Sequence, residues 1–194
     1  MGGGGAGHLH QARPHRRHRP PAPEHRSVRT VEGSDGMTDV VAPALAGHQF
    51  FRGMPVHHLA YLADVTSLAT VPARHRFFEA GGVAQHFWLI RAGQVALDLR
   101  VPGAGRVVVE TIGRGEMVGV SWFFPPYQWQ FGAVAVQPTE VFQLDAGAVR
   151  QHCETDPEFG YQFTQRMIAV VARRLQATRI RLLDVCTGRD LPGA

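Results

Sequence analysis

The stretch from Gly119 to Ala133 contains the residues best suited to bind a small molecule. Six of its fifteen residues are aromatic: Trp122, Phe123, Phe124, Tyr127, Trp129 and Phe131. Hydroxyl and amide side chains lie between them: Ser121, Gln128 and Gln130. Because small-molecule sites are mostly apolar with a few polar anchors, this composition predicts a pocket for a flat ligand of low charge. The alternative is that the aromatic rings fill the space themselves as part of a core.

Histidine and cysteine occur together at two other places, in His57-His58 and in His152-Cys153-Glu154. Such side chains can ligate metals, but no repeated ligand spacing joins the two groups. This favours surface or helix-end histidines over a metal site. Ser121 lacks the pattern of a nucleophile elbow, and no other persuasive catalytic set is evident. The sequence therefore predicts neither an enzyme nor a bound cofactor or metal.

Length and charge narrow the remaining classes of function. The 194 residues suffice for one domain with appendages, and 44% of them are hydrophobic. All twenty basic residues are arginine, and six of them fall within residues 1–36, where three residues are acidic. This segment therefore holds most of the formal net charge of +4. The rest of the chain is nearly neutral, so it gives no basis for predicting a nucleic-acid-binding domain.

Both ends of the chain are predicted to be disordered tails. Residues 1–36 are rich in Gly, His, Arg and Pro and contain few large apolar side chains, so they cannot offset the entropy of ordering. Met37 is an alternative start of the chain. Residues 188–194 form the second tail, because Gly188 and Pro192 stop the helix that precedes them.

The sequence predicts a cytoplasmic protein that does not cross a membrane. No apolar run approaches the roughly 20 residues that a membrane-spanning helix needs, and the N-terminus lacks the apolar region of a secretory signal. The two cysteines, Cys153 and Cys186, match no zinc-ligand spacing. Two reduced thiols in a cytoplasmic protein are the preferred interpretation.

Residues 37–156 are expected to form a helical segment and then a β-structure. Pro55 suits the first turn of a helix whose Leu59, Leu62 and Val65 share one face, and Pro72 ends that region. Short apolar runs then alternate with glycine-containing turns, over residues 76–79, 87–90, 95–99, 107–112, 133–136 and 141–144. Tight turns with positive φ are expected at Gly81, Gly93 and Gly115. Many short strands of this kind indicate a closed sandwich or barrel.

Residues 157–187 are predicted to form one long helix. Asp145 can cap a shorter helix over residues 146–153, and Pro157 can open the long one. Apolar residues follow at spacings of four and three, with Phe159 and Phe163 extending the pattern towards the N-terminus: Met167, Val171, Leu175, Thr178 and Leu182. This spacing is typical of a coiled-coil seam and predicts a homodimer that pairs through these residues.

The order of elements and the glycine motifs resemble the cyclic-nucleotide-binding domain family. The run from Arg76 to Ala84, followed by the run from Phe87 to Val95, is similar to the opening of that domain. Residues 113–119 resemble its glycine-containing turn. The resemblance covers roughly residues 45–186. It implies an α+β fold, in which an antiparallel β-roll of jelly-roll type is flanked by N-terminal helices and a long C-terminal helix. In the catabolite-activator superfamily, that long helix forms the homodimer interface.

The resemblance also implies where a ligand would bind. In the family, a Gly-Glu pair begins the phosphate-binding segment and an arginine near its end neutralises the cyclic phosphate. Here Gly119 matches, but the glutamate position is Val120, and the arginine position falls on Trp129 or Gln130. Because a buried anion without a charge partner costs several kcal/mol, on the order of 3–5, we expect poor binding of cyclic AMP. The candidate ligand-binding residues are Gly119, Val120, Ser121, Trp122, Trp129, Gln130 and Phe131.

Three functions remain open from the sequence. The first is a standalone regulatory domain that senses a small ligand as a homodimer. The second is a roll that has lost its ligand and acts in dimerisation or protein interaction. The third is a cyclic-nucleotide-responsive regulator whose effector domain lies on another chain. Only eight residues follow Cys186, too few for a helix-turn-helix, so we do not expect direct DNA binding.

Overall fold

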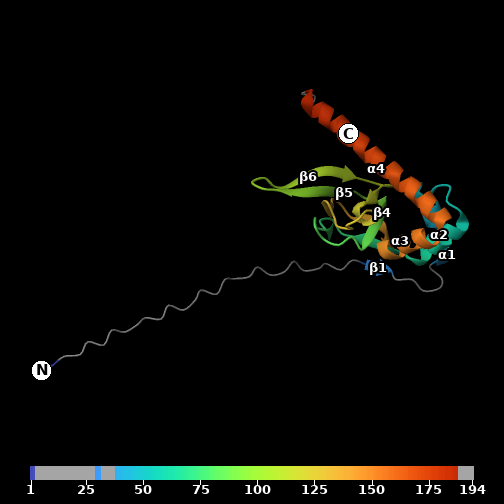
Figure 1. The fold of residues 1–194 in the computed structure, drawn as a ribbon, viewed down its shortest axis with the longest axis horizontal. Helices are drawn as coiled ribbons and strands as arrows, with labels where there is room; N and C mark the ends of the chain where they lie inside the picture. The colour runs from blue at the N-terminus through green and yellow to red at the C-terminus, as the bar shows by residue number, and fades with distance from the viewer. Residues whose placement is uncertain (3–28, 32–37, 188–194) are drawn as a thin grey trace.

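A computed structural model of the chain describes residues 1–2, 29–31 and 38–187. Helices lie at both ends of the described core, and strands lie between them (Figure 1). The N-terminal elements are β1 (Arg29–Val31), α1 (Thr38–Ala46), the 3₁₀ helix η1 (Gln49–Phe51) and α2 (Val56–Asp64). The strands that follow are β2 (Thr66–Val71), β3 (Arg76–Phe78), β4 (His86–Ala92), β5 (Val95–Val101), β6 (Gly105–Ile112) and β7 (Met117–Val118). The 3₁₀ helix η2 (Ser121–Phe123), β8 (Gly132–Ala135), β9 (Thr139–Asp145), α3 (Ala146–Thr155) and α4 (Pro157–Cys186) complete the described chain.

The strands form two antiparallel sheets that together make a roll. One sheet has the order β1-β2-β9-β4-β7, and the other has the order β3-β8-β5-β6. In the first sheet, Phe142 of β9 lies opposite Leu68 of β2 on one side and Leu89 of β4 on the other. Buried side chains of these strands face a single core. The predicted α+β fold, with an antiparallel β-roll and a long C-terminal helix, is confirmed.

Local sequence signals account for several turns and helix ends. The Asp145 carboxylate accepts a hydrogen bond from the backbone N–H of Ala148, which caps α3 as predicted. Gly81 and Gly115, each at φ 85°, and Gly93, at φ 98°, all have the positive φ that was expected of them. At Gly93 a side chain would also collide with the backbone of Thr139, because its β-carbon would lie 2.7 Å from that residue's α-carbon.

Two segments differ from the sequence-based expectation. The helix that begins after Pro55 ends at Asp64, and Thr66–Val71 forms β2 instead of continuing the helix to Pro72. Arg29–Val31 forms β1, which pairs with β2, so the prediction of disorder over residues 1–36 is wrong for these three residues. Residues 3–28 and 32–37 and the predicted tail at 188–194 lie outside the described part of the chain.

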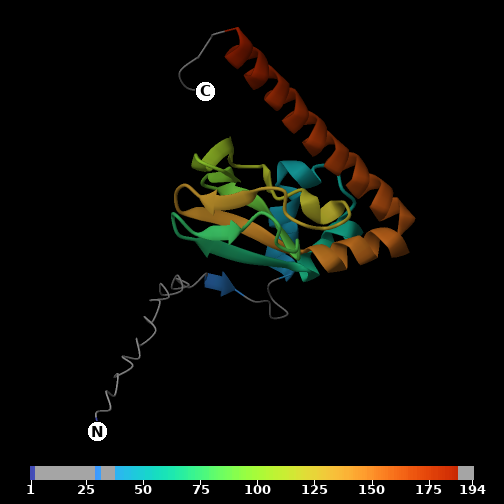
Figure 2. The same ribbon diagram turned by 60° about the vertical axis from the view of Figure 1, so that its left-hand side comes forward.

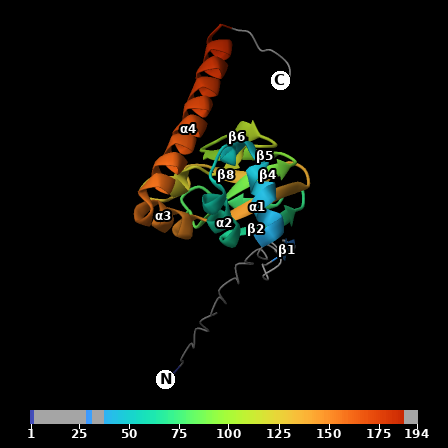
Figure 3. The same ribbon diagram turned by 90° about the vertical axis from the view of Figure 1, so that its right-hand side faces the viewer.

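The long helix α4 begins packed in the core of the roll, and its C-terminal end extends beyond the roll (Figures 2 and 3). Phe159, Phe163 and Met167 in its first half are completely buried in the core of this chain. Towards its end, Leu175, Leu182 and most of their neighbours are exposed. The described residues contain no helix that is both long and apolar enough to span a membrane.

Candidate functional site

A cavity of about 450 Å³ lies between the roll and α4. Strands β3, β5 and β6 and the segment after β7 supply one side, and α4 supplies the other. The lining is mainly apolar, from Phe78, Leu97, Val109, Gly119, Val120, Trp129, Phe131, Val171 and Leu175. Its polar members are Glu110, Ser121, Arg174 and Thr178. This volume and this chemistry suit a drug-sized ligand with a few polar groups.

Trp129 and Phe78 form an aromatic stack at the wall of the cavity. Their ring centroids lie 3.8 Å apart with an interplanar angle of 13°, and Trp129 is only 4% exposed. Backbone hydrogen bonds hold Trp129 in place, because its N–H donates to Gly82 O and its carbonyl accepts from Gly81 N. Gly119, at φ 80°, lies against the indole. Trp129 is one of the two positions at which the resemblance would place an arginine, and here it is a flat hydrophobic ring.

The structure brings together five of the seven candidate ligand-binding residues at this cavity. Gly119, Val120, Ser121, Trp129 and Phe131 line it. Gln130 is exposed and is not among the lining residues, although its backbone N–H lies 3.4 Å from the Ser121 hydroxyl oxygen.

Trp122 lies in the core and does not line the cavity. It is completely buried, and its indole stacks on Phe87 at 4.1 Å with an interplanar angle of 5°. Its ring also meets Phe163 of α4 edge-on at 5.7 Å. The aromatic residues of this segment therefore fit both interpretations of the sequence, the ligand pocket and the filled core, at different positions. Trp122 is a core residue, whereas Trp129 and Phe131 face the cavity.

Arg174 is a cationic site residue that the sequence reasoning missed. It reaches the cavity from α4, and its Nη2 donates a hydrogen bond to the backbone carbonyl of Met117 in β7. Burial lowers the pKa of Arg174, while the nearby carboxylates of Glu110 and Glu116 act in the opposite direction. The guanidinium nevertheless stays charged, as arginine does in proteins. The same side chain also borders a second cavity of about 360 Å³, lined in part by Gln49 and Glu116.

The predicted dimer seam on α4 has two different environments. Met167 is completely buried within its own chain, so it has no surface to offer a partner, and its place in the seam needs correction. Val171, Leu175 and Leu182 are exposed by 37%, 50% and 62%, and Thr178 is exposed as well. These four residues remain a predicted interface. Val171, Leu175 and Thr178 also line the cavity, so the same helix face borders the candidate ligand site.

Comparisons with known proteins agree with this architecture. Residues 68–156 match the family model for the cyclic nucleotide-binding domain. The curated proteins include none that matches the chain.

Three solved structures illustrate the likeness of fold. A cyclic nucleotide-binding domain from Methylobacillus flagellatus KT matches with a TM-score of 0.68 and 18% identity, over 84% of this chain and 91% of that one. A cAMP-binding acyltransferase from Mycobacterium smegmatis matches with a TM-score of 0.60 and 22% identity, over 73% of this chain and 43% of that one. The catabolite activator protein of Thermus thermophilus matches with a TM-score of 0.56 and 22% identity, over 71% of this chain and 62% of that one. These structures show the likeness of fold, and the family match identifies residues 68–156 as a cyclic nucleotide-binding domain.

Proposed function

We propose that this protein is a regulatory domain that senses a small ligand in the cavity between the roll and α4. The observation that carries the proposal is the position of α4, which supplies Val171, Arg174, Leu175 and Thr178 to the cavity wall. A ligand in this cavity touches the roll and the helix together. Its binding energy therefore depends on where the helix lies, and this dependence is what a sensor needs.

The chemistry of the cavity favours a flat, largely apolar ligand with one anionic or hydrogen-bond-accepting group. The Phe78–Trp129 stack offers an aromatic face, and Arg174 offers the cation. Glu110 lines the same cavity, and its carboxylate would repel a second negative charge. Val120 cannot accept a hydrogen bond from a ribose hydroxyl as a glutamate does. We therefore expect cyclic AMP to bind poorly, because its usual partners are replaced.

The signal is expected to pass through the orientation of α4. A ligand that binds one position of this helix more tightly shifts the population towards that position. The exposed apolar side chains at Val171, Leu175 and Leu182 support a homodimer that pairs through α4. The output would then be read by an effector on another chain. A cytoplasmic location fits two free cysteines and stays a prediction.

The main alternative is a roll without a ligand that serves only in dimerisation or protein interaction. The cavity of about 450 Å³ argues against it, because the aromatic side chains leave space beside Trp129 that no side chain fills. An enzyme is not favoured either. The match to the acyltransferase covers 43% of that protein, so likeness to it does not carry its chemistry to this chain.

Thermal melting of the full chain with single compounds tests the proposal. The set should include 3′,5′-cyclic AMP, cyclic GMP, and flat aromatic compounds with and without a carboxylate. We expect a saturable rise in Tm with an aromatic carboxylate, since a ligand that binds the folded state stabilises it by mass action. Arg174→Gln should reduce this rise, whereas Arg179→Gln, an exposed arginine outside the cavity, should not.

Two results would contradict the proposal in different ways. Calorimetry that shows cyclic AMP binding at micromolar concentration or tighter would overturn the proposed ligand chemistry but keep the sensor. No shift with any compound would overturn the sensor and favour the interaction module.

A further inference from the structure

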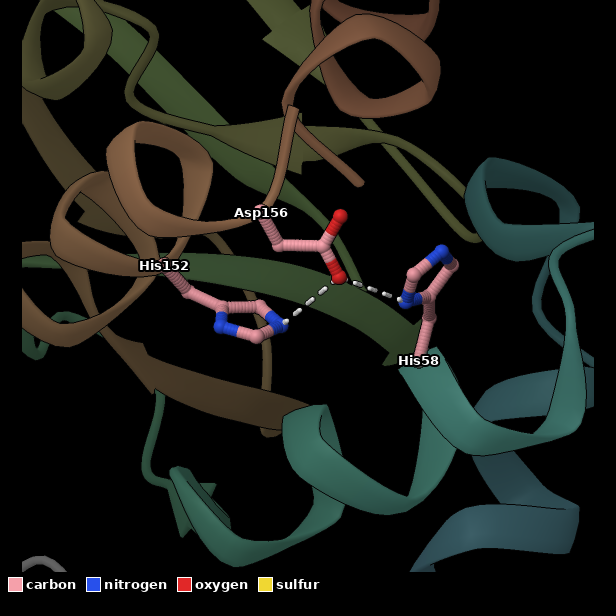
Figure 4. Close-up of side chains that lie close together, drawn as sticks. All are labelled: His58, His152 and Asp156. Carbon is pink, nitrogen blue, oxygen red and sulfur yellow. Dashed lines mark ion pairs between the residues drawn. The ribbon is translucent and has the colours of Figure 1, made fainter. Parts of the chain in front are cut away.

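Three side chains from separate elements meet at the junction of α2, α3 and α4 (Figure 4). His58 comes from α2, His152 comes from the last turn of α3, and Asp156 lies between α3 and α4. Their potential ligand atoms all lie within 4.8 Å of one another. Figure 4 shows the two imidazole rings on either side of the carboxylate, each with one nitrogen turned towards it. No ligand spacing in the sequence joins these residues, because 93 residues lie between His58 and His152.

The distances are longer than hydrogen bonds and close to those of ligands that share an ion. His58 Nδ1 lies 3.8 Å from Asp156 Oδ2, and His152 Nε2 lies 4.0 Å from the same oxygen. A hydrogen bond between such atoms would be roughly 2.7–3.2 Å long. Zinc holds histidine nitrogen and carboxylate oxygen at roughly 2.0–2.2 Å. The three donors therefore surround a space into which such an ion fits after small side-chain movements.

Neighbouring groups orient two of the three donors. Asp156 Oδ1 accepts hydrogen bonds from the backbone N–H groups of Glu158 and Phe159 at the start of α4, which leaves Oδ2 to face the histidines. The His152 ring stacks on Tyr61 with a centroid separation of 3.7 Å and an interplanar angle of 20°. Tyr61 in turn donates a hydrogen bond from its hydroxyl to the Ala148 carbonyl. Such supporting contacts fix ligand orientation in metal sites.

His58 presents its ring to the cluster from a buried position. It is 1% exposed and packs edge-on against Phe159 at 5.2 Å. Its Nδ1 is the ring nitrogen that faces Asp156, and this nitrogen is the one available to an ion. His152 and Asp156 are exposed by 21% and 34%, so an ion can reach the site from solvent.

We propose that His58, His152 and Asp156 form a binding site for a divalent transition-metal ion of the zinc type. Two imidazoles and one carboxylate are a donor set that such ions accept, with water completing the coordination. The ion would join α2, α3 and the start of α4. It would thereby fix the base of the helix whose later residues line the candidate ligand cavity. This site lies outside that cavity, and it does not depend on the proposed function.

The test measures stabilisation of the full chain by Zn²⁺ after treatment with a chelator. Stabilisation is the appropriate readout because histidines within residues 1–36 can also take up zinc, so the amount of bound zinc alone would not identify the site. We expect Zn²⁺ to raise Tm by several degrees in the wild type. We expect His152→Gln and Asp156→Asn to lose most of this rise, and Asp156→Asn keeps the oxygen that caps α4. The matched control is His57→Gln, an exposed histidine next to His58.

Absorption of the Co²⁺-loaded protein supplies a second readout. Nitrogen and oxygen ligation should give visible bands in the wild type and in His57→Gln, and the affinity for Co²⁺ obtained by titrating these bands should fall by at least about tenfold in the two cluster variants. A Tm that does not respond to Zn²⁺ in the wild type would overturn the proposal. It would equally fail if the rise persisted in His152→Gln and Asp156→Asn, because the ion would then be bound elsewhere.

Discussion

The indole of Trp129 lies so close to the α-carbon of Gly119 that a β-carbon there would stand 2.5 Å from Cζ3 of the ring. Real β-carbons are not found so near to other heavy atoms. Gly119 also has a φ of 80°, which other residues rarely adopt. The close approach of Trp129 to the backbone therefore requires glycine at position 119. The same contact holds Trp129 at the wall of the cavity.

Gly119→Ala should destabilise the protein by about 2–4 kcal/mol, through collision with Trp129 added to backbone strain. Gly53→Ala is a matched control, because Gly53 has a similar φ of 74° but nothing within 4 Å of its added β-carbon. The free energy of unfolding of that variant should fall only by the cost of backbone strain, about 1 kcal/mol. Urea unfolding measures both. Equal losses of unfolding free energy in the two variants would show that the contact with Trp129 adds nothing to the cost of Gly119→Ala.

Asp98 of β5 forms an ion pair with Arg76 of β3. Its carboxylate accepts hydrogen bonds from Arg76 Nη1 at 2.9 Å and Nη2 at 2.6 Å, and it is 3% exposed. These bonds from Arg76 lower the pKa of Asp98 from its ordinary value of 3.8. The folded protein thus keeps Asp98 charged at pH values where the unfolded chain takes up a proton. This contribution is full above about pH 5 and is lost as the pH falls towards the folded pKa.

We therefore expect Asp98→Asn to unfold more easily than the wild type at pH 7, by about 1–3 kcal/mol, because Arg76 loses a charged partner. The difference should shrink as the pH falls below about 4, because the unfolded wild type then takes up a proton at Asp98 that the folded protein takes up only at lower pH. Urea unfolding at pH 7, 5, 4 and 3 checks this. Glu79→Gln, at a 54% exposed residue that pairs with Arg106, should show a smaller difference at pH 7. A pH-independent difference for Asp98→Asn would contradict the argument.

Signals within a few residues of one another predicted most of the fold. Asp145, Pro157 and the positive-φ glycines act on the backbone beside them, so their effects can be read from the sequence. Strand β2 was missed because Val65 alone separates it from α2. Val65 continues the apolar spacing of the helix, so the sequence shows no break there. Only the pairing of β2 with β9 distinguishes the strand.

The parts of the site that depend on tertiary packing could not be predicted. The seam spacing on α4 marks an apolar face but does not say how much of it the roll covers, so Met167 was assigned to a partner rather than to the core. Arg174 was missed for the same reason, because nothing in the sequence indicates that this helix position faces Met117 and Glu110. His58 and His152 meet only through the packing of α2 on α3.

The two free cysteines should differ in reactivity. Burial raises the pKa of the Cys153 thiol to about 11, whereas Cys186 is exposed near the end of α4. Since the thiolate is the reactive form, iodoacetamide at pH 8 should modify Cys186 first and Cys153 on the order of 100-fold more slowly. Mass spectrometry of timed samples gives the two rates. In urea the rates should become similar, and similar rates in the native protein would contradict the burial of Cys153.

Leu182 tests the predicted homodimer without disturbing the ligand cavity, because Leu175 lines that cavity and Leu182 does not. Leu182 is 62% exposed, and it lies seven residues after Leu175, on the same face of α4. Light scattering of the wild type should give twice the 21.3 kDa of one chain. Leu182→Asp should reduce the mass towards that of a monomer, because each copy would bring a charge into an apolar seam.

The matched control is Ile180→Asp. Ile180 is exposed to nearly the same extent, at 61%, but it lies five residues after Leu175 and therefore on the opposite side of the helix. Its replacement should leave the mass of the dimer unchanged. If Ile180→Asp dissociates the dimer and Leu182→Asp does not, the copies pair through the other face of α4. In that case the ligand cavity and the interface would lie on different sides of the helix, and coupling between them would require rotation of α4 rather than direct contact.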